Sequence, residues 1–208
     1  MFKKFSMILI LPVLLLPSLL FSESLKIKGL TNYWDGNLAI IGLIKNEKTT
    51  AVSYVQVGLI CRGSTDQLVY TDTTYALCPI PPNDEIPFRF LISEADTEDI
   101  KTYSVSIDDY SIGGSGTFNF EIGQLSITEK NDLFHKYSGI IKNPNSRLYK
   151  YVNICFLGFD ENGELEYYDN TYPKKSNIPA GGESFFEILI PPKISDKIDK
   201  YRCFAYAD

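Results

Sequence analysis

Gly42-Leu43-Ile44-Lys45-Asn46 decides the fold of this chain, because the same pattern returns as Gly139-Ile140-Ile141-Lys142-Asn143. The match continues in one register, without a gap, with Tyr54-Val55 on Tyr151-Val152, Tyr70-Thr71-Asp72 on Tyr167-Tyr168-Asp169, and Thr74-Tyr75 on Thr171-Tyr172. After one inserted residue it resumes, with Ile80-Pro81 on Ile178-Pro179, Phe88 on Phe186, Ile100 on Ile198, and Tyr103 on Tyr201. A register of this length indicates two copies of one module.

The repeat predicts how the chain is divided. We expect a signal peptide over residues 1–24, a first β-sandwich repeat over 25–110, a short Gly/Ser linker over 111–116 and a second β-sandwich repeat over 117–208. Each repeat has the size of a small domain. Because the linker is short, we expect the two copies to lie close together.

The spacing of apolar residues is typical of β-strands. Val55, Val57, Leu59 and Cys61 alternate with their neighbours, which places one apolar face on a strand. The same signal recurs at Leu25–Ile27, Leu38–Ile40, Leu68–Tyr75, Ile86–Ile92, Tyr103–Ile107, Leu125–Thr128, Phe134–Ile141, Lys150–Phe159, Glu164–Tyr168, Ser184–Ile190 and Tyr201–Tyr206. Asp35-Gly36 favours a hairpin turn, and the acidic stretch Glu94–Asp99 fits either one helical turn or a loop. Short strands with frequent turn signals predict an all-β protein in which each copy is an antiparallel sandwich.

The first residues have the pattern of an export signal. Lys3 and Lys4 precede the apolar stretch Met7–Phe21, and small residues follow at Ser22 and Ser24. We expect cleavage near Ser24, no membrane span afterwards, and a final location in the periplasm, at the cell surface or in the medium. A retained anchor is the alternative, but the apolar stretch is shorter than the roughly 20 residues that span a bilayer.

The charge of the chain argues against nucleic acid as a partner. The formal net charge is −6, and it becomes about −7 once the signal is removed. Nucleic-acid binding depends on clustered Lys and Arg, which an acidic chain does not favour.

All four cysteines lie beyond the signal, two in each copy, so an exported chain could form disulfides. The simplest pairing joins Cys61 to Cys78 and Cys155 to Cys203 within the copies. Four cysteines allow three connectivities, and these pairs do not occupy matching positions of the repeat. A metal site is not expected, because no two cysteines are close in sequence and the chain has one histidine.

The stretch Cys155-Phe156-Leu157-Gly158-Phe159-Asp160-Glu161-Asn162-Gly163-Glu164-Leu165, with Gly139–Asn143 and Tyr151-Val152 before it, resembles the FxLYD-type β-sandwich domains of exported bacterial proteins. Pro179-Ala180-Gly181-Gly182 and Phe185-Phe186 match a later part of that pattern. The first copy departs from it at Cys61-Arg62-Gly63 and at Pro82-Asn83-Asp84. The resemblance implies tandem immunoglobulin-like domains outside the cytosol, and it brings no catalytic residues and no cofactor.

Two stretches of possible chemistry have a simpler structural explanation. His135 is the only histidine and lies in an expected strand without a nucleophile motif, so we expect it to be exposed and the chain not to be an enzyme. Asp160-Glu161-Asn162-Gly163-Glu164 has alternating oxygen ligands, as a calcium loop has, but it lacks flanking helices. A hairpin turn explains it better, with Gly163 in a left-handed conformation.

Aromatic residues are the candidates for binding. Tyr33, Trp34 and the adjacent pair Tyr167-Tyr168 cannot all point into a core, since neighbours on a strand face opposite ways. The sequence therefore predicts a non-enzymatic extracytoplasmic interaction or structural module with an unknown protein partner. The alternative is a glycan or small ligand bound by these exposed aromatics.

Overall fold

The computed structural model describes residues 25–34 and 36–207, so the expected signal peptide lies outside the described residues. Strands make up most of this part: β1 (Leu25–Trp34), β2 (Asn37–Asn46), β3 (Val52–Arg62), β4 (Leu68–Tyr75), β5 (Glu85–Ser93), β6 (Thr102–Ile112), β7 (Glu121–Ile122), β8 (Ser126–Lys130), β9 (His135–Lys142), β10 (Tyr149–Lys150), β11 (Asn153–Phe159), β12 (Leu165–Thr171), β13 (Asn177–Ile178), β14 (Glu183–Ile190) and β15 (Lys200–Tyr206). Two helices of one turn, α1 (Glu94–Thr97) and α2 (Pro192–Ser195), accompany them. Within the described residues, no helix has the length and apolar character needed to cross a membrane.

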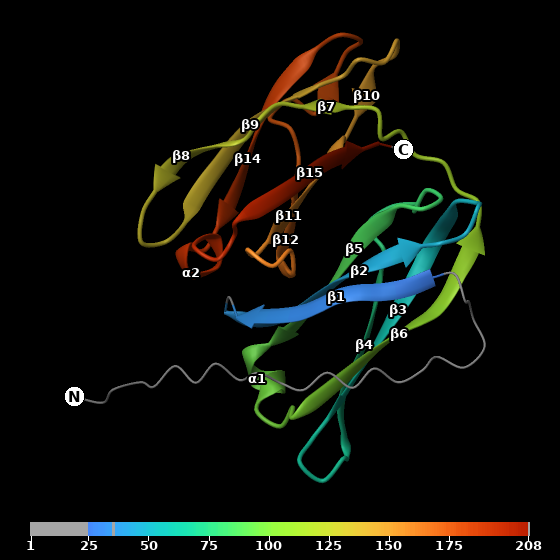
Figure 1. Ribbon diagram of the computed structural model, residues 1–208, viewed down its shortest axis with the longest axis vertical. Helices are drawn as coiled ribbons and strands as arrows, with labels where there is room; N and C mark the ends of the chain where they lie inside the picture. The colour runs from blue at the N-terminus through green and yellow to red at the C-terminus, as the bar shows by residue number, and fades with distance from the viewer. Residues whose placement is uncertain (1–24, 35, 208) are drawn as a thin grey trace.

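The first copy places two antiparallel sheets face to face (Figure 1). One sheet has the strand order β1-β2-β5 and the other the order β4-β3-β6. Their inner faces share one buried cluster that includes Ile40, Leu59 and Phe88. The alternation that predicted strands therefore marks the side chains of this core.

The second copy repeats the plan. Its sheets have the orders β14-β9-β7, with β8 also paired to β9, and β12-β11-β15, while β10 and β13 form a separate short pair. A second buried cluster, with Phe156 and Phe186 among its members, lies between them. The structure confirms an all-β fold built from antiparallel sandwiches.

A third buried cluster joins the two copies, and we call it the seam: Ile41, Leu43, Cys155, Leu157, Leu165 and Tyr168. Ile41 and Leu43 lie on the face of β2 opposite its core residues, and Cys155 and Leu157 lie on the corresponding face of β11. The sheet β1-β2-β5 of the first copy therefore packs against the sheet β12-β11-β15 of the second (Figure 1). The central strands β2 and β11 are therefore buried on both faces.

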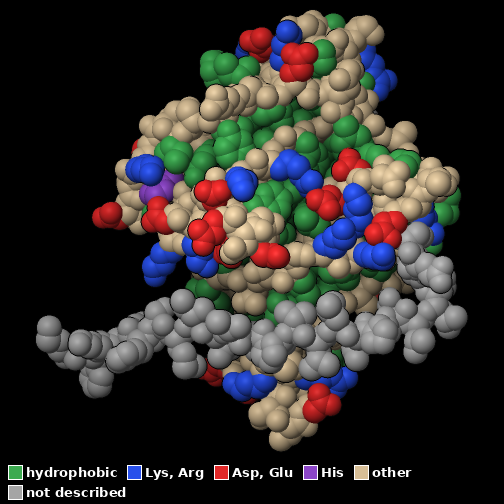
Figure 2. All heavy atoms as spheres, viewed as in Figure 1, with side chains coloured by type: hydrophobic (Ala, Val, Ile, Leu, Met, Phe, Trp, Pro, Cys, Tyr) green, Lys and Arg blue, Asp and Glu red, His purple; other side chains and the backbone are tan. Residues whose placement is uncertain are grey.

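Polar contacts surround the apolar part of the seam. Arg89 of β5 lies 3.2 Å from Oδ1 of Asp169, and Arg202 of β15 lies 2.9 Å from Oε1 of Glu85. The Tyr206 hydroxyl donates a hydrogen bond of 2.8 Å to the carbonyl oxygen of Leu77. Figure 2 shows charged side chains of both signs in a band across the level where the copies meet.

The backbone repeats as closely as the sequence does. Tyr54 and Tyr151, which the register aligns, have φ values of 50° and 51°. Left-handed residues also occur at the aligned pairs Asp66 with Gly163 and Asn83 with Gly181. Because bulky residues rarely adopt this conformation, its recurrence at Tyr54 and Tyr151 shows that one local structure has been kept twice.

Two local features differ from the sequence expectations. The alternating stretch 117–122 contains only the two-residue strand β7 and an isolated bridge between Thr117 and Ala207. The short helix α2 was not expected after Pro191-Pro192, yet it occupies the same place in the repeat as α1. Proline is compatible with the first turn of a helix, because its missing N–H is not needed there.

Candidate interaction surfaces

The four candidate aromatics do not form one exposed group. Tyr167 and Tyr168 are both buried, with 4% of their surface exposed, so the prediction that this pair supplies aromatic surface is wrong. Tyr167 packs into the core of the second copy, whereas Tyr168 packs into the seam. In a single sandwich one face of this strand would meet solvent, but here the first copy covers that face.

Tyr33 and Trp34 also differ in their exposure: Tyr33 is partly buried, whereas Trp34 is exposed. The Tyr33 ring lies 5.4 Å from the Tyr167 ring, and its hydroxyl donates to the carbonyl oxygen of Tyr168 at 3.4 Å. Trp34 is half exposed at the β1–β2 turn. Of the four candidates, Trp34 is the most exposed.

The cysteines do not form the expected pairs, and no disulfide occurs in the described part of the chain. Cys61 on β3 is paired with Tyr70 on β4. Cys78 follows Ala76, whose N–H donates a hydrogen bond to the carbonyl oxygen of Val55 near the other end of β3. Six residues of strand separate these ends by roughly 20 Å, far beyond disulfide reach.

The second expected pair fails for a different reason. Cys155 is opposite Phe204 and Cys203 is opposite Phe156 on neighbouring strands, so the two thiols point to opposite faces of one sheet. Cys155 packs in the seam, and Cys203 packs against the core of the second copy. Burial raises the pKa of the Cys203 thiol to about 12 and that of Cys61 to about 11.

His135 is buried rather than exposed, which corrects the sequence expectation. Its Nδ1 lies 2.8 Å from the Ser195 hydroxyl and 3.8 Å from the Asp196 carboxylate. The Ser195 hydroxyl is also 2.9 Å from the Tyr137 hydroxyl. A catalytic triad needs serine and aspartate on different ring nitrogens, but here both approach the same one. Ser195 is itself buried, so the contacts hold α2 against β9.

The Asp160 loop is a hairpin turn, as expected. The Asp160 carboxylate accepts hydrogen bonds from the backbone N–H groups of Asn162 and Glu164 at 2.9 and 2.8 Å, and Gly163 has a φ of 84°. The bond from Glu164 is the main reason that the pKa of Asp160 is lowered. No group of side chains in residues 25–34 and 36–207 is arranged to hold a metal ion.

Each end of the stack presents one open sheet face. In the first copy this is the outer face of β4-β3-β6, and it is mostly polar. The register places Gly58, Ile60, Thr71 and Ser106 there, at the positions that Cys155, Leu157, Tyr168 and Phe204 occupy in the seam. This face has lost the apolar character of its counterpart.

The open face of the second copy is the outer face of β8, β9 and β14, and it keeps exposed apolar side chains. Phe185 is 65% exposed and lies directly opposite Ile140. Leu189 is 49% exposed and lies on the same face of β14, four residues further along the strand. By the repeat this face corresponds to the outer face of β1-β2-β5, which the seam covers. The remaining open sheet face of the second copy is therefore a copy of a surface used for packing.

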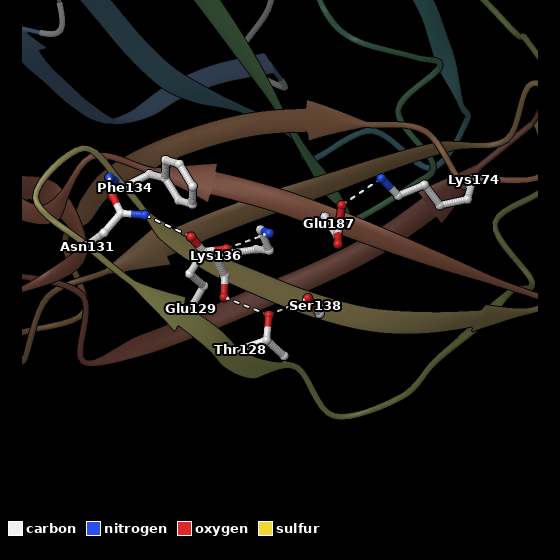
Figure 3. A network of polar contacts seen from close by, with 8 residues as sticks. All are labelled: Thr128, Glu129, Asn131, Phe134, Lys136, Ser138, Lys174 and Glu187. Atoms are coloured by element: carbon white, nitrogen blue, oxygen red, sulfur yellow. Dashed lines mark hydrogen bonds and ion pairs between the residues drawn. The ribbon is translucent and has the colours of Figure 1, made fainter.

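Ion pairs and hydrogen bonds link side chains on this face and beside it (Figure 3). Lys136 lies 2.7 Å from Glu129, and Lys174 lies 2.6 Å from Glu187. These bonds raise the pKa of Lys136 and lower that of Glu187. The Thr128 and Ser138 hydroxyls are 2.7 Å apart and link β8 to β9. The network fixes the side chains around the apolar residues.

A surface groove of about 540 Å³ adjoins the network. Lys136, Glu187 and Leu189 line it from the sheet, and Tyr172 and Lys174 line it from the segment after β12. The open face and the groove are continuous through these shared residues.

The sequence matches no known family model, and curated proteins give no match. Among solved structures, a red sea bream transglutaminase is similar over 81% of this chain, with 10% identity and a TM-score of 0.28. The N-terminal CBM22 tandem domain of Paenibacillus barcinonensis Xyn10C is similar over 88% of this chain and 83% of its own, with 7% identity and a TM-score of 0.20. The chain spans about a quarter (26%) of the transglutaminase. Likenesses of this size indicate no activity, and the class that the structure defines is that of all-β sandwich proteins.

Proposed function

We propose that this chain is a non-enzymatic, extracytoplasmic interaction module that binds another protein through the open face of β8, β9 and β14. The observation that carries the proposal is the equivalence of this face to the covered face of the first copy. Leu43 packs in the seam, and its counterpart Ile140 stays 38% exposed beside Phe185. An apolar sheet surface of this kind favours a protein partner.

The partner is expected to differ from the chain itself. Head-to-tail packing of identical modules can continue without end, because each added copy presents the same two faces. In the repeat, Glu187 of the second copy is the counterpart of Arg89, and Asp72 of the first copy is the counterpart of Asp169. A further chain stacked in the same way would bring two carboxylates together where the seam has an ion pair. This repulsion favours a different protein over a second copy.

The test uses the mature chain to capture partners from envelope extracts of its source. We expect reproducible recovery of a partner by the wild type and its loss with Phe185→Asp, because a charge would replace the most exposed apolar side chain on the strands of this face. Thr73→Asp on the open face of the first copy is the matched control and should retain the partner. Equal recovery by all three proteins, or no reproducible partner, would contradict the proposal.

Binding of a glycan through exposed aromatics is the second candidate, and the half-exposed ring of Trp34 favours it. Aromatic rings with a polar edge are suited to surfaces that are partly wet. On a glycan array, Trp34→Ala should then lose retention while Tyr75→Ala, an exposed tyrosine elsewhere in the first copy, should keep it. Unchanged retention of the Trp34 variant would remove this candidate.

A further inference from the structure

A second surface hollow lies in the second copy, and none of its lining residues belongs to β8, β9 or β14. It has a volume of about 530 Å³ and is lined by five consecutive residues, Arg147, Leu148, Tyr149, Lys150 and Tyr151. Leu148 is 48% exposed and Tyr151 is 74% exposed. The hollow therefore combines two cationic side chains with exposed apolar surface.

The loop that carries this hollow is held in place from several directions. The buried Asn143 donates a hydrogen bond of 2.8 Å to the carbonyl oxygen of Arg147. Tyr149 is buried, and its hydroxyl is 2.8 Å from the hydroxyl of Thr117. The Arg147 guanidinium lies 4.6 Å from the centre of the Tyr149 ring. A binding surface that is ordered in advance loses little conformational entropy when a ligand arrives.

Tyr151 is exposed by a strained backbone. Its φ of 51° is unfavourable for a bulky residue, and its N–H donates to the carbonyl oxygen of Ser176 at 3.0 Å. Such strain persists only where the surrounding structure fixes it, and it is frequent at binding sites. The first copy shares the strain at Tyr54, so strain alone does not identify a site.

The cations distinguish the second copy from the first. The register places Thr50, Ala51 and Ser53 where the second copy has Arg147, Leu148 and Lys150. The same backbone frame therefore occurs once without charge and once with two cations beside an exposed ring. Within the described residues, neither Arg147 nor Lys150 forms a salt bridge, so both can receive an anion.

We propose that this hollow binds a carboxylated saccharide. The carboxylate accepts hydrogen bonds from the Arg147 guanidinium and the Lys150 ammonium, since arginine holds a carboxylate through two parallel bonds. The C–H face of the sugar ring packs on Tyr151 and Leu148. This site is separate from the protein-binding face and does not depend on it.

Other anionic partners fit less well. Recognition of an anionic membrane by charge usually requires four to eight clustered basic residues, and the hollow has two. Nucleic acid is repelled by a chain whose formal net charge is −6. A short acidic saccharide needs only a local pair of cations and a flat apolar face.

The experiment is calorimetric titration of the full mature chain with a tetramer of galacturonic acid, with a tetramer of galactose as the uncharged control. We expect the acidic tetramer to bind and the neutral one to bind at least tenfold more weakly. Arg147→Thr and Lys150→Ser, which install the residues of the first copy, should each weaken binding about tenfold. Tyr151→Asn should do the same, because asparagine tolerates the left-handed backbone but lacks the ring.

Tyr54→Asn and Trp34→Ala are the matched controls and should bind as the wild type does. Equal binding of the two tetramers, or no loss in the Arg147 and Lys150 variants, would overturn the proposal. Binding that is lost with Trp34→Ala would place the saccharide at the β1–β2 turn instead. A further outcome would contradict the saccharide: the acidic tetramer does not bind, but the chain sediments with anionic phospholipid vesicles and Arg147→Thr abolishes this. The ligand of the hollow would then be a membrane surface. Because Lys150 makes no salt bridge among the described residues, its variant tests the site even if loss of Arg147 disturbs Tyr149.

Discussion

Asn46 and Asn143 are fully buried and make the same hydrogen bonds in the two copies. The amide of Asn46 donates to the carbonyl oxygens of Thr50, Ile80 and Pro81 at 2.9, 3.0 and 3.1 Å. The amide of Asn143 donates to the carbonyl oxygens of the repeat counterparts Arg147, Ile178 and Pro179 at 2.8, 2.9 and 3.1 Å. The sequence motif Gly-x-x-x-Asn is therefore kept for a buried polar contact that closes each sandwich.

Asn143→Ala should destabilise the protein by about 2–4 kcal/mol. The change removes three hydrogen bonds from this amide, to the backbone carbonyl oxygens of Arg147, Ile178 and Pro179, and one such bond contributes about 0.5–1.5 kcal/mol. Urea unfolding at equilibrium measures the free energy of unfolding. Asn46→Ala should give a loss of similar size, whereas Ser146→Ala at an exposed position of the same loop should change little. Equal effects of Asn143→Ala and Ser146→Ala would contradict the role assigned to this amide.

Tyr54→Gly should raise the free energy of unfolding by up to about 1 kcal/mol. A non-glycine residue at a left-handed φ costs roughly 1–2 kcal/mol, and the Tyr54 side chain is 76% exposed, so little packing is lost. The entropy cost of glycine offsets part of the gain. Tyr54→Val should lower the free energy of unfolding by about 1 kcal/mol, since β-branched residues resist this conformation. Denaturant melts in which valine is as stable as glycine would rule out backbone strain as the cause.

Asp160→Asn should lower the melting temperature at pH 7 and have little effect at low pH. Hydrogen bonds, chiefly from the Glu164 backbone N–H, lower the pKa of Asp160 below its ordinary value of 3.8. A lowered folded-state pKa contributes stability above the ordinary value, and this contribution is lost as the pH falls through the lowered value. The melting temperatures of wild type and variant should therefore converge only as the pH falls below 3.8 and through the lowered pKa of the folded state. Glu161→Gln in the same turn serves as the control, and a difference that persists at low pH would exclude the charge as the source.

Cys61, Cys155 and Cys203 should react slowly with a thiol reagent at neutral pH while the protein is folded. Burial raises the pKa of all three thiols, so few thiolates form, and the thiolate is the reactive species. Unfolding in denaturant without a reducing agent should make all three react rapidly. Mass spectrometric mapping of the labelled sites checks the result. Sites that stay unlabelled after unfolding and become labelled only after reduction would reveal a disulfide.

The repeat made much of the fold predictable from the sequence. Its register placed Asn46 on Asn143 and Tyr54 on Tyr151, and the buried amides and left-handed residues follow that register. Alternation of apolar residues located most strands, because half-buried strands impose that period. The turn at Gly163 was predictable for the same reason, since its residues act locally.

The errors came from contacts between the copies, which no local pattern records. Tyr168 and Cys155 are buried because the first copy covers their face of the sheet, although a single sandwich would leave that face open. His135 was expected to be exposed, but Ser195 of α2 packs over it from sixty positions further along the chain. The loop around Arg147 carried no motif, and only comparison with the matching loop of the first copy could have drawn attention to its two cations.

The central claim is that the two copies form one body through the seam, and cleavage of the linker tests it most directly. A protease site inserted at Gly113–Gly116, between β6 and the Thr117 bridge, allows the folded chain to be cut once. After complete cleavage, size-exclusion chromatography should show both fragments eluting together at the position of the uncut chain, and Leu157→Asp should separate them. Two separately eluting, folded fragments from the wild-type sequence would contradict the account.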